Sequence, residues 1–146
     1  MINFRKITEE NFDKIIKMKR PEGENFLCEN SVALAQAWLY RDDGDVFSFA
    51  IYNGDECVGF MQLEEDCEEN ELIIWRIMFP EENANKGYGT AAIKLVIELA
   101  KESRKYDHVL LGCKPENKRA YHVYEKIGFV PTGKTEYGEE EMIFRF

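Results

Sequence analysis

Residues 72–90 have the sequence LIIWRIMFPEENANKGYGT, which joins a strand to a helix through a glycine-containing turn. The residues before Pro80 are apolar except for Arg76, as expected for a strand that is covered on both faces and therefore central in a sheet. Pro80 ends the strand because it has no backbone N–H for a sheet ladder. Residues 87–102 then predict a long helix with a wide apolar stripe that includes Leu99. The segment predicts the start of a strand–helix–strand crossover.

The rest of the chain predicts an α+β fold, in which a mixed, mostly antiparallel sheet is flanked by about four helices. Asn53-Gly54 is a hairpin signal, because both residues tolerate positive φ. The acidic residues between Glu64 and Glu71 are expected in a solvated turn. Expected strands cover residues 2–7, 46–52, 57–63, 72–79, 107–113 and a final hairpin over 132–146, and expected helices begin after Thr8, Ser31, Gly87 and Asn117.

Capping residues and apolar spacing predict how the helices begin and which faces they bury. Thr8 is expected to cap the first helix, and Asn117 the last. Gly128 supplies the left-handed position that ends the last helix. In the second helix, apolar residues at helical spacing predict the buried face as Leu34, Ala35, Trp38 and Leu39.

Size and charge exclude several classes of protein. The 146 residues, 45% of them hydrophobic, predict a single domain over residues 1–146. Nineteen basic and 28 acidic residues give a net charge of −9, so no nucleic-acid partner is expected. The charge either maintains solubility or attracts a cationic substrate. No apolar stretch has the length of a membrane span or signal peptide, which predicts a cytoplasmic protein with no membrane partner.

The cysteines and histidines do not predict a metal site. The four cysteines form no C-x-x-C pair, and only two histidines are available, His108 and His122. Structural zinc sites use closely spaced pairs of such ligands. We therefore expect free thiols in a reducing compartment and no bound metal.

The turn over residues 80–90 is the first candidate site, because it exposes backbone N–H groups at the positive end of a helix. Such a turn binds phosphate oxygens, and Gly87 and Gly89 allow close approach of the anion. An ordinary strand-to-helix loop is the alternative. Seven residues separate Phe79 from Gly87, which disfavours a dinucleotide fold, and a P-loop is excluded because Lys86 precedes Gly87.

A second segment, residues 117–129, has the sequence NKRAYHVYEKIGF. Together the two segments resemble the GNAT superfamily of acyl-CoA-dependent N-acetyltransferases, whose signatures are [QR]-x-x-G-x-[GA] and, after a further strand, N-x-x-A-x-x-x-Y-[ED]-[KR]-x-G-F. The expected element order fits that fold along essentially the whole chain. Residues 26–37, 75–78 and 132–133 are similar to bacterial spermine/spermidine acetyltransferase-like members of the superfamily.

The resemblance implies acetyl-CoA as co-substrate and indicates which residues bind it. Tyr124 is expected to protonate the departing thiolate, although a core tyrosine is the alternative from the helix pattern alone. A backbone N–H near Phe79 is expected to polarise the thioester carbonyl. Ala84 stands where the family has Gln or Arg, so one side-chain contact is lost. The residues expected to bind the coenzyme are Ile77, Met78, Phe79, Ala84, Asn85, Lys86, Gly87, Tyr88, Gly89, Thr90, Asn117 and Tyr124.

The resemblance also implies direct transfer of the acetyl group to a primary amine of a small molecule, with spermidine or spermine as one candidate. Glu29, Trp75 and Arg76 are the candidate acceptor residues. Some polyamine-acetylating relatives have an acid where this chain has Trp75, so the general base is unassigned. Arg76 is either a partnered structural ion or a residue of the acceptor cleft. A non-catalytic acyl-CoA-binding module and a peptide N-terminal acetyltransferase remain open, as does a homodimer.

Overall fold

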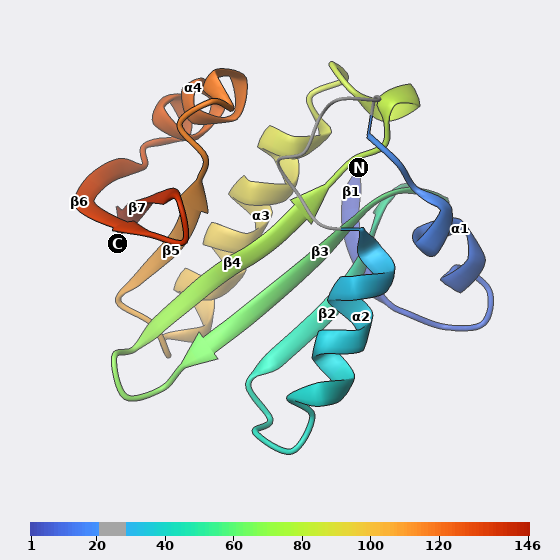
Figure 1. Cartoon of the computed structure of the whole chain (residues 1–146), viewed down its shortest axis with the longest axis horizontal. Coiled ribbons are helices and arrows are strands. Elements are labelled where there is room, and N and C mark those ends of the chain that lie inside the picture. The colour runs from blue at the N-terminus through green and yellow to red at the C-terminus, as the bar shows by residue number, and fades with distance from the viewer. Residues whose placement is uncertain (21–28) are drawn as a thin grey trace.

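The computed structural model describes residues 1–20 and 29–146, in which one seven-stranded sheet has helices on both faces (Figure 1). The strands are β1 (Ile2–Lys6), β2 (Val46–Asn53), β3 (Glu56–Asp66), β4 (Glu71–Met78), β5 (His108–Cys113), β6 (Val130–Glu136) and β7 (Glu139–Arg145). The helices are α1 (Phe12–Lys17), α2 (Asn30–Leu39), α3 (Tyr88–Ser103) and α4 (Lys118–Ile127), with a 3₁₀ turn η1 (Glu81–Asn83). The α+β prediction is confirmed. The predictions that involve residues 21–28 lie outside the described part.

The strand order is β1-β2-β3-β4-β5-β7-β6, so β4 is central as its apolar sequence predicts. Only β4 and β5 pair in parallel among the described strands, and α3 makes the crossover between them. The other neighbours are antiparallel, including the hairpin over Asn53–Glu56. The last strand, β7, lies between β5 and β6, a position that no local sequence pattern predicts.

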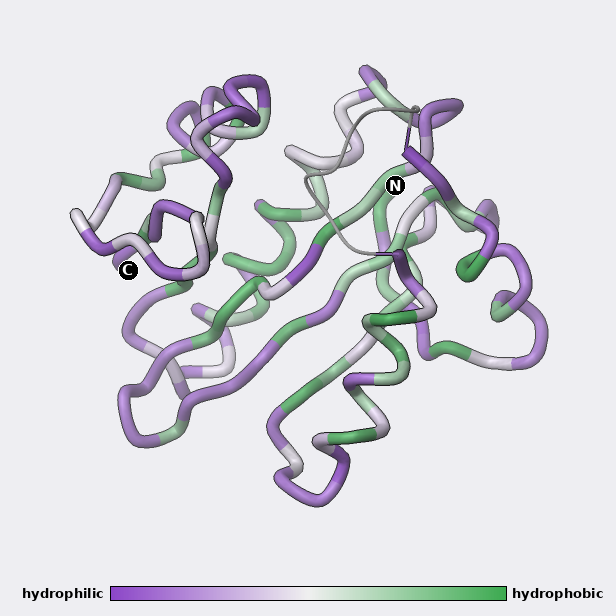
Figure 2. The backbone as a smooth tube through the Cα atoms, viewed as in Figure 1, coloured by the Kyte–Doolittle hydropathy of each residue, from purple (hydrophilic) through white to green (hydrophobic). Residues whose placement is uncertain are grey.

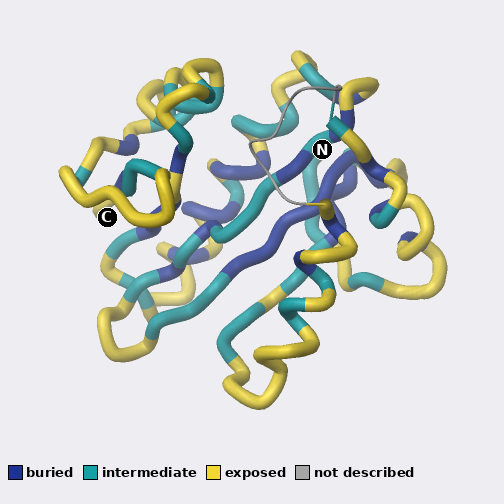
Figure 3. Tube along the Cα trace, viewed as in Figure 1, coloured by how far each residue is buried: buried dark blue, intermediate teal, exposed yellow. Residues whose placement is uncertain are grey.

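Two apolar layers cover the two faces of the sheet. On one face the stripe of α3, with Ile93 and Val96, packs on strand residues such as Val109. On the other face Ile15 of α1 and Ala33 of α2 pack on β2, β3 and β4. Figures 2 and 3 show hydrophobic and buried residues concentrated in the central strands, and polar and exposed residues along α4 and β6. None of the described helices has the length and apolarity that a membrane span requires.

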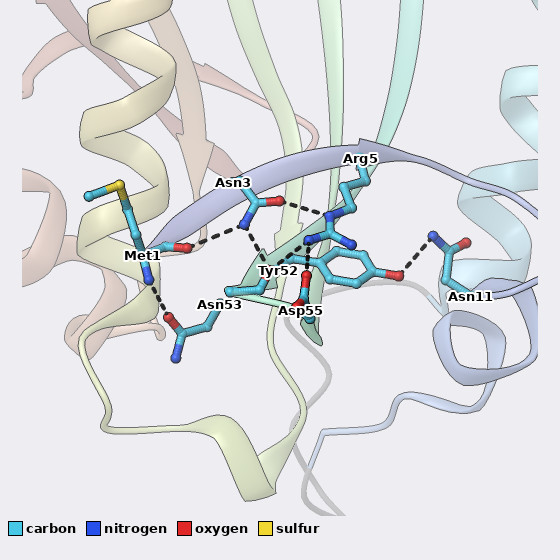
Figure 4. A network of polar contacts seen from close by, with 8 residues as sticks. Met1, Asn3, Arg5, Asn11, Tyr52, Asn53 and Asp55 are labelled. Carbon is cyan, nitrogen blue, oxygen red and sulfur yellow. Dashed lines mark hydrogen bonds and ion pairs between the residues drawn. The ribbon is translucent and has the colours of Figure 1, made fainter.

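A polar network fixes β1 to the hairpin between β2 and β3 (Figure 4). The guanidinium of Arg5 donates to Asp55 at 2.9 Å and to the Gly54 carbonyl at 2.8 Å, and it lies 4.1 Å from the centroid of the Tyr52 ring. The hydroxyl of Tyr52 accepts a hydrogen bond from the amide of Asn11, which is buried. The edge strand β1, the hairpin turn and the start of α1 are therefore held together.

Two predicted helix features are wrong. α1 begins at Phe12, and the side chain of Asn11 accepts a hydrogen bond from the N–H of Thr8 at 2.9 Å, so Thr8 does not cap the helix. In α2 the buried residues are Asn30 and Ala33. Of the predicted face, Leu34 is partly buried and packs on the core as expected, whereas Ala35 is exposed and Trp38 and Leu39 are 68% and 65% exposed. The small side chain of Ala33 lets the helix approach the sheet closely, and a hydrogen bond to its carbonyl from buried Gln62 fixes that face.

Two further expectations also need correction. The acidic stretch is not a turn throughout, because Glu64, Glu65 and Asp66 pair with Ile73, Leu72 and Glu71 in the β3–β4 ladder. Only residues 67–70 form the turn. The strands can contain the other acidic residues because an antiparallel hairpin can have one face in contact with solvent. Leu99 is 49% exposed and lies outside the buried stripe of α3.

Candidate active site

The parallel ladder between β4 and β5 ends early and leaves a fork in the centre of the sheet. The last pair is Ile74 with Leu111. Beyond it, β4 pairs only with β3 and β5 only with β7 among the described strands, so their facing backbone groups have no strand partner. A bulge at Trp75 accompanies the end of the ladder. A cavity of about 600 Å³ opens at this fork, between the ends of α3 and α4.

The loop before α3 forms one wall of this cavity. Asn85 and Gly87 have positive φ angles of 61° and 79°, which turn the chain sharply into the helix. The first intrahelical bond runs from the N–H of Ala91 to the carbonyl of Gly87, and no side chain caps the helix. The N–H groups of residues 88–90 therefore have no intrahelical acceptor, and these residues line the cavity. These N–H groups at the helix N-terminus can therefore bind an anion.

The neighbouring side chains fix this loop on the sheet. The ring of Phe79 lies over Gly59, where an added Cβ would come within 2.7 Å of it. The hydroxyl of Tyr88 accepts a hydrogen bond from Asn53 at 3.3 Å, and buried Asn83 donates to the Val58 carbonyl at 3.1 Å. The loop is therefore held by contacts to β3 and its hairpin, independently of any ligand.

The opposite wall is the start of α4. The side chain of Asn117 accepts a hydrogen bond from the N–H of Ala120 at 3.3 Å, so the predicted cap is confirmed. Lys118 and Arg119 occupy the first turn, where the helix dipole disfavours cations. Both line the cavity, together with Lys86 from the facing loop. These three cations face one another at the loop and α4 side of the cavity, in a chain of net charge −9, and they indicate an anionic ligand there.

Tyr124 projects from α4 into the same cavity. Its ring contacts Phe129 edge-on, with the centroids 6.1 Å apart. Burial raises the pKa of the Tyr124 phenol well above its ordinary value, and the nearby Cys113 and Glu139 raise it further. The hydroxyl therefore stays protonated throughout the physiological range, and it can donate a proton to a group in the cavity.

Cys113 also lines the cavity, but its surroundings do not activate it as a nucleophile. Burial, with the charges of Glu139 and Glu140, raises the pKa of its thiol to about 11. Neither histidine lies among the residues that line the cavity: His108 pairs with Glu71 at 3.3 Å, and His122 with Glu125 at 3.5 Å. A thiol without a base stays protonated at neutral pH.

Arg76 is a partnered ion, which is one of the two interpretations of its sequence position. Its guanidinium donates hydrogen bonds to the side-chain oxygens of Gln62 and Gln36, and it lies 4.2 Å from the centroid of the Trp75 ring. It also lines the cavity. Arg76 is thus a partnered ion whose charge faces the side of the cavity next to α2.

The cavity brings together nearly all of the predicted site residues. It is lined by Trp75, Arg76, Ile77, Met78, Phe79, Ala84, Asn85, Lys86, Gly87, Tyr88, Gly89, Thr90, Asn117 and Tyr124. Glu29 is exposed at the start of α2 and does not line it. Sequence reasoning missed Arg20, whose guanidinium donates to the Phe79 carbonyl at 2.7 Å, and Glu139 of the last strand.

Comparison with known proteins agrees with this arrangement. The acetyltransferase (GNAT) family matches residues 12–129. A probable spermine N(1)-acetyltransferase from Bacillus subtilis subsp. natto is 22% identical, over 99% of this chain and 97% of that protein.

Solved structures with the same fold include three acetyltransferases. A spermidine N-acetyltransferase from Vibrio cholerae, in complex with CoA and spermine, has a TM-score of 0.76 and 16% identity, over 99% of this chain and 95% of that one. The aminoglycoside acetyltransferase AAC(6')-Ib, in complex with coenzyme A, has a TM-score of 0.79 and 18% identity, over 99% and 95%. The PaiA N-acetyltransferase from Thermoplasma acidophilum, with coenzyme A, has a TM-score of 0.75 and 16% identity, over 100% and 99%. The chain belongs to the acetyltransferase (GNAT) family and is an acetyl-CoA-dependent N-acetyltransferase.

Proposed function

We propose that this enzyme transfers the acetyl group of acetyl-CoA directly to a primary amine of a small molecule, with a polyamine as the preferred acceptor. The observation that carries the proposal is the forked sheet. One cavity holds an anion-binding loop on one side of the fork and a protonated tyrosine, Tyr124, on the other.

The residues present fit coenzyme A. Backbone N–H groups of residues 85–90 receive the pyrophosphate, whereas the N–H of Ala84, which was expected to contribute, donates to the Glu81 carbonyl at 3.0 Å. Lys86, Lys118 and Arg119 neutralise the phosphate charges. These cations compensate for the missing Gln or Arg at Ala84. The facing edges of β4 and β5 have free backbone groups, which hydrogen-bond the amides of the pantetheine arm as a neighbouring strand would.

In the proposed reaction the amine nitrogen attacks the thioester carbonyl carbon and the C–S bond breaks. A backbone N–H near Phe79 stabilises the developing negative charge on oxygen. The Tyr124 hydroxyl gives its proton to the departing thiolate sulfur. No acyl-enzyme forms, because the Cys113 thiol remains protonated and has no histidine beside it.

The similarity to named spermine and spermidine acetyltransferases supports a polyamine acceptor. The net charge of −9 also favours a cationic small molecule over an anionic one. Arg76 opposes cations locally, so we place the amine that reacts away from its guanidinium, on the β5 side of the fork.

Release of free thiol from acetyl-CoA tests the proposal, with spermidine, spermine, an aminoglycoside, amino acids and a short peptide as acceptors. Fastest turnover with a polyamine supports the full proposal. Fastest turnover with another amine retains the direct transfer and rejects the polyamine. Stabilisation by acetyl-CoA without turnover of any amine indicates a coenzyme-binding module.

Substitution of the cavity thiol separates direct transfer from an acyl-enzyme. We expect Cys113→Ala to retain turnover within a few-fold of wild type, and incubation with labelled acetyl-CoA alone to leave no label on the protein. Loss of turnover in a folded Cys113→Ala protein, together with labelled wild-type Cys113, would reject the direct mechanism.

A further inference from the structure

Gly112 gives Glu139 access to the fork. Gly112 is the first residue of β5 beyond the last pair with β4, so the space above it is the apex of the fork. A Cβ at residue 112 would lie 2.3 Å from Oε2 of Glu139 and 3.3 Å from its Cβ. The carboxylate of Glu139 therefore occupies the space that any larger residue at position 112 would fill.

The strand register explains how Glu139 reaches this place. Glu141 is the direct partner of Gly112, and Glu139 lies two residues along β7 on the same face. The carboxylate of Glu141 accepts a hydrogen bond from the Thr132 hydroxyl at 2.9 Å, which draws it toward β6. Glu139 is then free to reach diagonally across β5.

Glu139 and Tyr124 lie on opposite faces of the sheet. Val109, Leu111 and Cys113 belong to the apolar layer under α3, and Tyr124 packs against that layer. Gly112 alternates with these residues, so the Glu139 carboxylate lies over the other face, where α1 and α2 are. An acceptor that enters opposite the coenzyme and Tyr124 meets Glu139.

Glu139 is also the acid best suited to hold an amine. Among the described residues that line the cavity, only Glu116 and Glu139 are acidic. Glu116 is exposed and precedes the cationic start of α4. Glu139 is partly buried, and its carboxylate makes no hydrogen bond or ion pair with any residue in the described part of the chain, so both carboxylate oxygens can accept from a ligand.

We infer that Glu139 binds the acceptor nitrogen and accepts its proton, and that Gly112 positions Glu139 for this role. The inference rests on the proposed function. The ammonium first loses one proton to solvent, and the neutral amine attacks the thioester carbon. The nitrogen becomes positively charged and acidic as the C–N bond forms, and it passes one proton to the Glu139 carboxylate. The C–S bond then breaks, and the sulfur takes the proton of Tyr124.

Steady-state kinetics with acetyl-CoA and spermidine test the inference on the full chain. We expect Glu139→Gln to lower kcat/KM for spermidine by at least about 100-fold at neutral pH, with the affinity for coenzyme A unchanged. The difference in kcat/KM between Glu139→Gln and the wild type should become smaller as pH rises, because hydroxide then replaces the missing base. Glu140→Gln, the same change at the next position on β7 and outside the cavity, should stay within about two-fold of wild type.

Gly112→Ala tests the positioning role with Glu139 still present. We expect Gly112→Ala to lower kcat/KM for spermidine about as much as Glu139→Gln does. The double variant with both substitutions should have a kcat/KM no lower than that of Glu139→Gln alone. Titration of spermidine into the complex with coenzyme A gives a readout without turnover, and there Glu139→Gln should weaken binding at least about ten-fold.

Three results would overturn the inference. One is a Glu139→Gln protein that retains more than half of the wild-type kcat/KM and spermidine affinity. Another is an equal loss in Glu140→Gln. The third is a double variant whose kcat/KM falls by the product of the two single-variant losses. If the wild type binds coenzyme A and spermidine but transfers no acetyl group, the proposed function fails while the binding titration still tests Glu139.

Discussion

The guanidinium of Arg76 lies 4.2 Å from the centroid of the neighbouring Trp75 ring, while it donates hydrogen bonds to Gln62 and Gln36. The bulge at Trp75 brings these two consecutive residues of β4 onto the same face of the sheet. A single cation thus links the central strand to β3 and α2 at the edge of the cavity, and its own position is fixed by three partners.

Arg76→Ala should destabilise the protein by about 1–3 kcal/mol, because the oxygen of fully buried Gln62 loses its hydrogen-bond donor. Chemical denaturation measures this change. Arg41→Ala is the matched control, since Arg41 lies 3.8 Å from the Trp38 ring centroid at the exposed end of α2. We expect it to cost under about 1 kcal/mol. Equal effects of the two substitutions would contradict the assigned role of Gln62.

Tyr124→Phe should lower kcat by about 100-fold or more, with little change in the affinity for acetyl-CoA, because only the proton donor is lost. The raised pKa of Tyr124 also predicts that the wild type has no alkaline loss of kcat from this group below about pH 10. Tyr121→Phe is the control, since Tyr121 is on the same helix but does not line the cavity. A similar kcat for both variants would exclude Tyr124 as the acid.

Gly87→Ala should weaken coenzyme A binding. Gly87 has a φ of 79° and open space around it, so alanine causes backbone strain of about 1 kcal/mol but no clash. Gly54→Ala has the same features, a φ of 63° and open space, in the hairpin between β2 and β3. Calorimetric titration should show weaker binding only for Gly87→Ala, although both variants lose similar stability. Equal affinities would place the pyrophosphate elsewhere.

Tyr106 should make stability depend on pH through Glu65. Hydrogen bonds from Cys67 and from the Tyr106 hydroxyl at 2.6 Å lower the pKa of the Glu65 carboxyl below its ordinary value of 4.5. That stabilisation is present above the ordinary pKa and is lost as pH falls through the lowered one. Tyr106→Phe should therefore reduce the Tm at pH 7, with a smaller reduction near pH 3. Tyr137→Phe, at a hairpin tip, should change the Tm at neither pH.

Local patterns were sufficient to predict the central crossover and both family segments. The apolar run before Pro80, the glycines of the loop and the Asn117 cap are each determined by neighbours in sequence, and the structure has all three. The first two helices were harder to predict. Thr8 and Asn11 are both residue types that favour a helix start. In the structure the side chain of Asn11 accepts from the Thr8 N–H and donates to the hydroxyl of Tyr52, a contact that is 41 residues away in sequence and that no local pattern predicts.

The placement of Glu139 could not be predicted, because it depends on strand order. A hairpin over residues 132–146 can add to the sheet through either of its strands, and sequence periodicity is the same in both cases. Only the pairing of β7 with β5 brings Glu139 above Gly112. The one local signal was Gly112 itself, a glycine within an apolar strand, which is typical of a close approach by another group.

The strand order β5-β7-β6 also determines when the site can form during translation. While residues up to the end of α4 have left the ribosome, β5 is joined to the sheet by only four residue pairs, and its other edge is bare. That edge is covered, and Glu139 arrives, once residues 139–145 emerge. The nascent chain therefore cannot assemble the complete fork until then, and in the interval it exposes a strand edge that is open to pairing with other chains.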